Sequence, residues 1–519
     1  MTNQNTILSN LDLISILRSR ITSYRGNSLV EKIIEKEIND EVSIIRFQNL
    51  DSSQIIKPLL FVDCVFNSNV NVEDYQSAGR VSFKNCKFNC AVKVQSENST
   101  FTGVCIFNHD LTIKLADDTE ISNYNVKGNF VILGKSKKLS LKNINKEEEI
   151  INQTVRLNGG FTELIIEEVF GKILEFSNKL ETQKDLVLKE IKVSELIIGI
   201  PILTSDLVIT SSKIGKIELT KEIKTIETLR IVDSEIDNMN FQINLISKML
   251  IIRGSFQNLT LLNSNKNNSI INIEKTTINI LKFDGLYNYG LITLRELNIP
   301  KKGLVSFKSS NLGNADFINW NFSNANFEFE NSKITQAFLS DSEFPKKVVV
   351  NGKINYSQAQ LAFGQLATAF QKQGDNIRAL EYNSRELEAH FRKINLFSSN
   401  FFQKINLWLN LTSNNFGRNW IRGVIFSFSI GLLFFLFLLV STNLFSWGIP
   451  NYENELIPAY LKFMNPLRFF ELENIFKNTP YKDKIILSEY SYLSDFIGRV
   501  FIAYGYYQTI QAFRRFGRK

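Results

Sequence analysis

A pair of branched apolar residues separated by one position returns every 21 or 22 residues through the middle of the chain. The seven pairs are Leu164/Ile166, Leu186/Leu188, Leu207/Ile209, Leu229/Ile231, Leu250/Ile252, Ile271/Ile273 and Ile292/Leu294. Alternation with a period of two is typical of a β-strand with one buried face. A single repeat of this length cannot bury its apolar face, so neighbouring copies are expected to stack into a solenoid.

A second apolar set follows most of these pairs after about ten residues. Its members are Leu196, Ile217/Leu219, Met239/Phe241 and Leu259/Leu261. Each coil then supplies two strands and a polar return, which is what one turn of a parallel β-helix needs. Leucine-rich repeats have similar periods, but their asparagine position and long helical return are not evident here. The sequence therefore predicts a mainly β fold, a right-handed parallel β-helix with coils of ~21 residues.

The same register extends upstream and includes the cysteines. FVDCVF (Phe61–Phe66) and FKNCKF (Phe83–Phe88) repeat one motif 22 residues apart, and a shorter third copy is CIF (Cys105–Phe107). The aligned thiols are Cys64, Cys86 and Cys105. A metal site at Cys86 and Cys90 would need further ligands, and the chain has only two histidines. Because a free cysteine packs as a small apolar residue, we predict buried thiols, no metal and no cofactor.

A five-residue spacing replaces this pattern near the end of the predicted solenoid. The residues that recur are Leu312, Phe317, Phe322 and Phe327. The segment resembles pentapeptide-repeat proteins, whose quadrilateral β-helix buries the central Leu or Phe. We interpret its roughly thirty residues as the last one or two coils of the same solenoid. Some pentapeptide proteins mimic DNA, but that function needs an acidic surface, which this segment lacks.

Helical spacing is found on both sides of the solenoid. We predict a helical cap over residues 1–40, the β-helix over 41–355 and a helical hairpin with an amphipathic helix over 356–412. The hairpin is similar to one tetratricopeptide unit, with Ser357 and Asp375 as the expected N-caps. Phe401, Phe402, Ile405, Trp408 and Leu409 suit a helix that lies on a membrane surface.

A long apolar run, VIFSFSIGLLFFLFLLV, occupies residues 424–440 and carries no charge. With its flanks it exceeds the ~20 residues that a helix needs to cross ~30 Å of hydrocarbon. Trp420 and Trp447 bracket the run, as aromatic residues do at both membrane interfaces. We predict that this helix is the first span of a two-span membrane domain at residues 413–519.

The second predicted span, residues 493–513, is much more polar than the first. Charged and amide side chains within a membrane normally face protein or water. The residues expected to line a pore are therefore Tyr504, Gln508, Gln511, Asp495 and Arg499, the last two as an i, i+4 pair at its mouth. The small residues expected at helix contacts are Gly498, Gly505 and Ala512. The segment could instead lie in the interface, or serve as an anchor whose polar groups pair with the first span.

Charge and the N-terminus predict the topology. The net charge of +8 is spread thinly, which suits a membrane-facing protein but does not by itself indicate nucleic-acid binding. The start, MTNQNTILSNLDL, lacks the basic and apolar regions of a secretory signal. Basic residues lie before the first span and after the second: Arg418, Arg422, Arg514, Arg515, Arg518 and Lys519. The positive-inside rule then predicts that both termini lie in the cytoplasm and residues 449–492 outside.

Two C-terminal segments carry a family resemblance: RVFIAYGYYQTIQAFRRFGRK (Arg499–Lys519) and GQLATAFQKQGDNIRALEYNSRELEAH (Gly364–His390). They resemble bacterial proteins that join a β-helix or pentapeptide sensor to a two-helix membrane module. The chain looks most like the Hailong-type channel effectors of anti-phage defence. That resemblance, over about residues 356–519, implies an oligomeric ion channel opened by short nucleic-acid oligomers from a partner nucleotidyltransferase. It assigns no ligand-binding residue to the β-helix.

Our hypothesis is a homo-oligomeric ion channel, with a tetramer as the working number, controlled by ligand or partner binding to the β-helix. It would act in anti-phage defence by depolarising the membrane. The alternative is a non-conducting, membrane-anchored β-helix scaffold, which predicts that Gln508→Leu and Gln511→Leu are tolerated. An enzyme is not expected, because two histidines leave little acid–base capacity near pH 7 and no charged cluster is evident on one sheet. We assign no catalytic residue.

Overall fold

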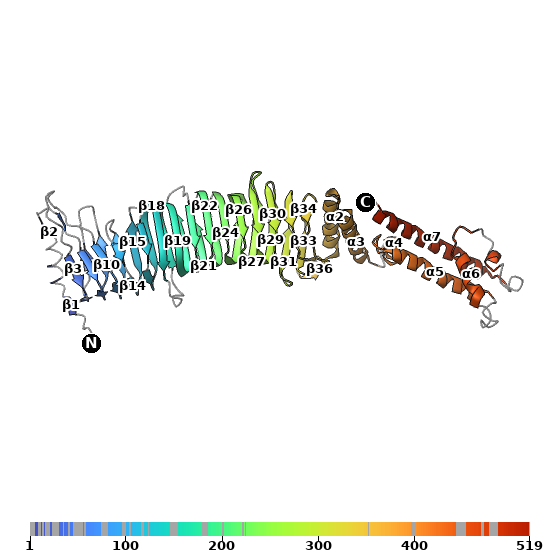
Figure 1. Ribbon diagram of the computed structural model, residues 1–519, viewed down its shortest axis with the longest axis horizontal. Coiled ribbons are helices and arrows are strands. Elements are labelled where there is room, and N and C mark those ends of the chain that lie inside the picture. Colours follow the sequence, from blue (N-terminus) through green and yellow to red (C-terminus); the bar gives the residue numbers. More distant parts are fainter. Residues whose placement is uncertain are drawn as a thin grey trace. The chain divides into compact units, whose positions relative to one another are not determined.

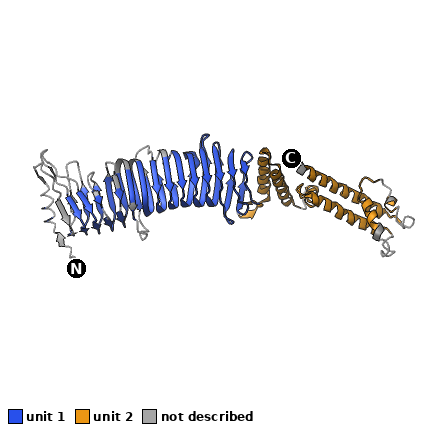
Figure 2. Cartoon of the chain, in the orientation of Figure 1, with its two compact units in different colours: residues 1–345 blue, residues 346–519 orange. Residues whose placement is uncertain are grey.

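The structure, a computed structural model, is drawn in Figure 1. The residues that it describes are 6–8, 12, 15, 21–22, 31–34, 36–39, 42–44, 55–56, 59–73, 81–95, 100–102, 105–115, 119–122, 124–145, 154–178, 185–199, 202–220, 223, 225–350, 352–395, 400–442, 453–468, 472–476 and 486–517. The chain forms two compact units, Met1–Pro345 and Lys346–Lys519 (Figure 2).

The first unit is a parallel β-solenoid of about 11 turns, with coils of about 22 residues. The predicted mainly β fold is therefore confirmed. Its strands are β1 (Thr6–Leu8), β2 (Ile21–Thr22), β3 (Glu31–Ile34), β4 (Lys36–Ile38), β5 (Val42–Ile44), β6 (Ile55–Ile56), β7 (Leu59–Val62), β8 (Val65–Phe66), β9 (Val70–Glu73), β10 (Val81–Lys84), β11 (Lys87–Phe88), β12 (Val92–Gln95), β13 (Thr100–Thr102), β14 (Cys105–Phe107), β15 (Leu111–Leu115), β16 (Thr119–Ser122), β17 (Tyr124–Val126), β18 (Phe130–Ile144), β19 (Thr154–Asn178), β20 (Asp185–Lys189), β21 (Lys192–Gly199), β22 (Ile202–Thr210), β23 (Lys213–Leu219), β24 (Thr225–Val232), β25 (Glu235–Gln242), β26 (Ile246–Ile252), β27 (Ser255–Ser264), β28 (Ile270–Glu274), β29 (Thr277–Tyr287), β30 (Leu291–Arg295), β31 (Leu304–Lys308), β32 (Ala315–Ile318), β33 (Asn326–Glu330) and β34 (Phe338–Ser340).

Inward side chains of successive coils stack in ladders that form the core. One ladder runs through Leu164, Leu186, Leu207, Leu229, Met249, Ile271 and Ile292. A second runs through Leu174, Leu196, Ile217, Met239, Leu259, Leu281, Val305 and Phe327. All of these side chains are buried, so each turn rests on the apolar face of the next.

The inward pair was predicted correctly in six of the seven coils and wrongly in one. Met249 and Ile251 face the core in the fifth coil, whereas Leu250 and Ile252 are half-buried. The step from Leu229 to its partner Met249 is 20 residues, shorter than its neighbours. Because strand side chains alternate between faces, a shift of one residue exchanges the inward and outward sets.

Serine hydroxyls hold the corner that follows the first strand of several coils. The Ser212 N–H donates to Ser234 Oγ at 3.2 Å, and the Ile191 N–H donates to Ser212 Oγ at 3.2 Å. Ser234 Oγ in turn donates to the carbonyl of Val232 at 2.9 Å. The residue before each of these serines has a positive φ, 48° at Ser211 and 51° at Asp233, so the chain turns there. Buried backbone groups at the turn are thereby satisfied.

The three aligned cysteines lie inside the solenoid, as predicted. Cys64, Cys86 and Cys105 are at most 1% exposed and all are free thiols. Aromatic ladders flank them, with ring centroids 5.2 Å apart for Phe61 and Phe83. Burial raises the pKa of Cys105 to about 11, so its thiol stays protonated at neutral pH. Within the described part of the chain, no group of three or more His, Cys, Asp or Glu side chains could hold a metal.

The helical cap expected over residues 1–40 is wrong at the positions of β1, β2, β3 and β4, which are strands. Strands β3 and β4 pair in parallel with β7 and β8. Ile33 pairs with Phe61, and Ile38 pairs with Phe66, so this segment belongs to the solenoid. Short apolar runs fit either period, and long-range pairing decided the outcome. Asp12 and Ser15 are helical, and most of the other residues before 31 lie outside the described part.

The four residues with five-residue spacing, Leu312 to Phe327, are all buried. Trp320 stacks between two of them, with ring centroids 5.2 Å from Phe317 and 4.5 Å from Phe322. Val305 pairs with Phe327, which sets the coil at 22 residues rather than at a multiple of five. The five-residue spacing thus covers less than one turn, so the segment shares only the inward spacing of pentapeptide repeats.

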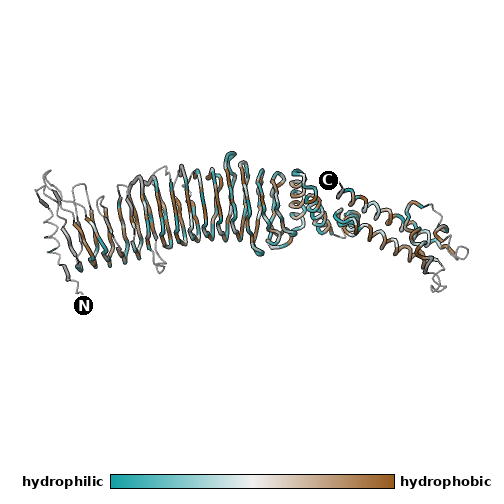
Figure 3. The backbone as a smooth tube through the Cα atoms, in the orientation of Figure 1, coloured by the Kyte–Doolittle hydropathy of each residue, from teal (hydrophilic) through white to brown (hydrophobic). Residues whose placement is uncertain are grey.

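The second unit is largely helical. Its elements are the antiparallel strands β35 (Val349–Val350) and β36 (Lys353–Ile354), then α2 (Tyr356–Lys372), α3 (Asn376–Lys393), α4 (Phe401–Asn414), α5 (Trp420–Ser441), α6 (Glu453–Phe463), the 3₁₀ turn η3 (Leu472–Ile475) and α7 (Glu489–Gly517). Hydropathy alternates along the solenoid strands and is high nearly throughout α5 (Figure 3). Asp375 caps α3, as predicted, but Asn355 rather than Ser357 caps α2.

Candidate membrane module

Among the residues that the structure describes, α5 is the one helix both long and apolar enough to cross a membrane. Its 22 residues correspond to ~33 Å of helix, about the thickness of the hydrocarbon core. The side chain of Asn419 caps it by accepting the Arg422 N–H at 3.2 Å. Its large exposed hydrophobic residues are Trp420, Ile421, Ile425, Phe428, Leu432, Leu433, Leu436, Phe437 and Val440, and Arg422 in its first turn is exposed as well. Trp447 lies outside the described residues.

Helix α7 lies antiparallel beside α5 along its whole length (Figure 1). Gly423 is next to Thr509 at one end, and at the other end the hydroxyls of Ser441 and Ser491 are 2.9 Å apart. While α5 advances 18 residues between these contacts, α7 runs back by 18. The segment from Ser491 to Thr509 therefore lies alongside residues 423–441 of α5. If α5 crosses a membrane, this segment of α7 lies at the same depth in it.

Small residues on α7 lie at its contacts with neighbouring helices. A methyl group at Gly505 would collide with Ser427 Oγ on α5. A methyl group at Gly498 would lie 2.8 Å from the Phe463 ring and 3.1 Å from Phe434 Cβ. Ala512 is fully buried. The close approach of α5, α6 and α7 thus depends on the absence of larger side chains at these positions.

Three charged side chains form a buried ionic cluster, defined here as Arg468, Asp495 and Arg499. Asp495 Oδ2 lies 2.9 Å from an Arg499 NH2 group, and Arg468 pairs with the other carboxylate oxygen. The side chains are 11%, 6% and 9% exposed, respectively. The Arg499 guanidinium also donates to the Arg468 carbonyl at 3.0 Å. The expected i, i+4 pair is present, and the antiparallel register places it opposite residues 433 to 437 of α5.

Sequence reasoning missed Arg468. It lies in the connection between the two predicted spans, which the charge pattern assigned to the outside, and no local motif marks it. Its guanidinium lies 4.8 Å from the Phe463 ring, and it donates to the Lys462 carbonyl at 3.2 Å. Helix α6 brings it there by packing in an apolar cluster with α5 and α7, whose central members are Phe435, Leu438, Phe463, Met464 and Ile502.

Two of the side chains expected to line a pore, those of Gln508 and Tyr504, form hydrogen bonds with α4 of the same chain. Gln508 is 4% exposed, and its Oε1 accepts the Asn414 side-chain amide at 2.5 Å. The Tyr504 hydroxyl donates to Asn410 Oδ1 at 3.4 Å. Gln511 is half-buried. The large exposed hydrophobic residues of α7 between Leu493 and Phe513 are Leu493, Phe496, Val500, Tyr507, Ile510 and Phe513.

Helix α4 presents two apolar faces. Leu407 is buried with Ile394 and Phe416 on the side that meets α3. On its other side it exposes four large residues, Phe401, Phe402, Ile405 and Trp408, of which Phe402 is 82% exposed. Three residues with positive φ follow, Asn415, Phe416 and Gly417, and reverse the chain into α5. An exposed aromatic face that leads directly into an apolar helix suits the boundary of a membrane.

No protein-family model, curated protein or solved structure matches this chain. The resemblance of the C-terminal module to channel effectors thus stays a prediction, whereas the solenoid and the apolar helix are observed.

Proposed function

We propose that this protein is an oligomeric membrane ion channel whose opening is controlled by binding to its β-solenoid. The observation that carries this proposal is the ionic cluster at the depth of α5. Charged side chains are costly inside a membrane and, where they occur, mark ion pathways and relays. An anchor helix needs neither two arginines nor an aspartate at that depth.

The antiparallel pair suggests how the pore is closed and opened. In this structure the polar side chains of α7 are turned toward α4, α5 and α6, while its exposed face is largely apolar. A pore lined by that apolar face would exclude ions by dewetting. We propose that opening rotates α7 and brings Tyr504, Gln508, Gln511, Asp495 and Arg499 toward the lumen. A ligand drives this change only if it binds the open state more tightly than the closed state.

The decisive test is ion flux through liposomes that contain the purified full chain. We compare the wild type with Gln508→Leu/Gln511→Leu, and use the exposed Gln371→Leu on α2 as the matched control. Flux that the double substitution changes and the control does not would support a pore. Absence of flux in every protein, with and without extract from phage-infected cells, would contradict the channel.

A second candidate function is a non-conducting scaffold. Its solenoid would bind a protein partner, and its membrane helices would only anchor it. The pairing of Gln508 with Asn414 inside one subunit favours it, because polar groups of an anchor helix would be satisfied in this way. The scaffold predicts that Gln508→Leu/Gln511→Leu leaves partner capture by the solenoid unchanged. The same liposome experiment separates the two candidates.

For the biological setting we propose the bacterial inner membrane, with the solenoid and both termini in the cytoplasm. In this setting the channel would depolarise the cell during phage infection, in response to a nucleic-acid oligomer from a partner nucleotidyltransferase. We propose no catalytic role for the chain itself. Reporter fusions at either terminus that are active only in the cytoplasm test the topology. Membrane-potential dyes in infected cells test the response, and unchanged potential would contradict it.

A further inference from the structure

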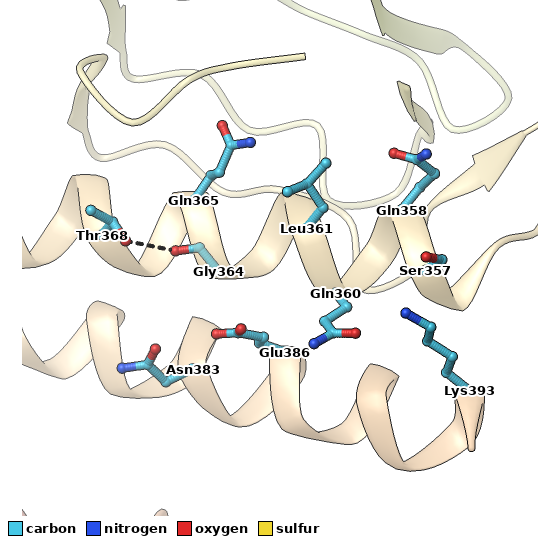
Figure 4. Close-up of a pocket in the computed structure, with 10 residues that line it drawn as sticks. All are labelled: Ser357, Gln358, Gln360, Leu361, Gly364, Gln365, Thr368, Asn383, Glu386 and Lys393. Atoms are coloured by element: carbon cyan, nitrogen blue, oxygen red, sulfur yellow. Dashed lines mark hydrogen bonds between the residues drawn. The ribbon is translucent and has the colours of Figure 1, made fainter. Parts of the chain in front are cut away.

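A groove of about 590 Å³ runs along the α2–α3 hairpin and is lined only by residues of these two helices (Figure 4). Its α2 side consists of Ser357, Gln358, Gln360, Leu361, Gly364, Gln365 and Thr368, and its α3 side of Asn383, Glu386 and Lys393. The volume lies within the range of small-molecule sites, ~300–1,000 Å³. Figure 4 shows Asn383, Glu386, Gln360 and Lys393 in a row along the gap between the helices.

The carboxylate of Glu386 packs against Gly364 of α2. A methyl group on Gly364 would lie 3.0 Å from the Glu386 carboxyl carbon and 3.0 Å from its Oε1. The carboxylate therefore lies close to the backbone of α2, and a larger residue than glycine would make it move by a few tenths of an ångström. A glycine inside a helix costs stability relative to alanine.

Glu386 is half-buried, and the described residues provide no hydrogen bond or ion pair to it. Burial raises the pKa of its carboxyl group, as expected when water is removed from an unpaired charge. Lys393, seven residues further along α3, is the other charged residue of the groove and is likewise unpaired among the described residues. Gly364 inside a helix and the unpaired carboxylate of Glu386 both lower the stability of the fold. Such costs are expected at functional sites.

We propose that this groove binds a small zwitterionic ligand, with an ammonium or guanidinium group on Glu386 and a carboxylate on Lys393. Seven residues along a helix separate the two Cα atoms by ~10 Å. An extended amino acid with a basic side chain, such as arginine, matches a span of this order between its charges. Asn383 and Gln360 supply amide donors and acceptors between the charged ends. The site is independent of any pore, because it belongs entirely to the hairpin.

Calorimetric titration of the full chain in lipid nanodiscs tests this assignment. The probes are L-arginine, agmatine, which lacks the carboxylate, and the peptide Gly-Gly-Arg, which presents the same carboxylate and guanidinium at a chain terminus. We expect arginine to bind the wild type, and Glu386→Gln to weaken arginine and agmatine at least tenfold. Lys393→Gln should weaken arginine but not agmatine. If Gly-Gly-Arg binds as tightly as arginine, the ligand can be the C-terminus of a peptide. If only arginine binds, the ligand is a free amino acid.

Two further variants distinguish a loss of binding from a loss of folding. Glu388→Gln changes a carboxylate on the same helix that is paired with Arg392 outside the groove, and binding should be unchanged. Gly364→Ala should abolish binding without lowering the melting temperature, which a packing role for this glycine would not allow. Binding of none of the three probes to the wild type would overturn the proposal. Equal affinities for Glu386→Gln and Glu388→Gln would overturn it as well. Neither result bears on ion flux.

Discussion

The side-chain amide of Asn414, the last residue of α4, donates a 2.5 Å hydrogen bond to Gln508 Oε1 on α7, across 94 residues of sequence. Both side chains are nearly inaccessible, at 1% and 4% exposure. Asn414 Oδ1 also accepts the Gly417 N–H at 2.8 Å. This pair therefore joins the turn between α4 and α5 to the polar face of α7.

Removing either partner should destabilise the packing of α4, α5 and α7. Asn414→Ala leaves the Gln508 amide buried without its partner, which costs about 1–3 kcal/mol. Gln508→Leu should cost a similar amount, and the double variant should cost less than the sum of the two. Thermal unfolding of all four proteins in one detergent measures this coupling. Additive losses would show that the hydrogen bond contributes nothing of its own.

The ionic cluster predicts an asymmetric response to substitution. Asp495→Ala leaves the Arg468 and Arg499 guanidinium groups facing one another in a buried site, so we expect a loss of about 3–5 kcal/mol. The control is Glu388→Ala, which breaks an exposed ion pair with Arg392 on α3 and should cost at most about 1 kcal/mol. Denaturant titration followed by tryptophan fluorescence compares them. Equal losses would mean that the cluster is solvated rather than buried.

Gly505 predicts a steric requirement at the α5–α7 contact. Gly505→Leu places a side chain on Ser427 Oγ, and overpacking of this kind costs about 1–3 kcal/mol. Ala503→Leu, two residues away on an exposed part of α7, should be tolerated. Protease resistance of the folded protein in detergent reports the difference. If both variants resist proteolysis like the wild type, α7 does not pack on α5 through this residue.

Glu386 predicts how the stability of the hairpin depends on pH. Burial raises its folded-state pKa above the unfolded value of about 4.3, so the folded state favours the neutral carboxyl. The stability due to this group is present below the unfolded pKa and is lost as pH rises through the folded pKa. Lys393, the other charged residue of the groove, forms no ion pair with this carboxyl group among the described residues. Glu386→Gln should remove this pH-dependent loss of stability, because glutamine does not ionise.

Melting temperatures of the wild type and Glu386→Gln between pH 3.5 and 7 measure the effect. The difference between the two proteins should grow in favour of the variant as pH rises. A constant difference would mean that Glu386 titrates as a solvated residue does.

The solenoid could be predicted because its information is local and repeated. Pairs such as Leu207/Ile209 show the strand period, and their return at a fixed interval shows the stacking. The errors arose where a single coil departs from the average. The shorter step to Met249 moved the inward face by one residue, and β3 and β4 became strands because β7 and β8 offered them partners.

For the helices α4 to α7, some contacts could be predicted from the sequence and others only from the tertiary structure. The apolar run of α5 and the pair Asp495–Arg499 are visible in the sequence, because each depends on neighbours within a few residues. Only the tertiary structure brought Arg468 to Asp495 and Asn414 to Gln508, because chain segments 27 and 94 residues apart meet there. Helical periodicity shows that polar residues share a face, but not what that face meets. What it meets is decided by the packing of α4, α5 and α6 around α7, where buried polar groups must find partners.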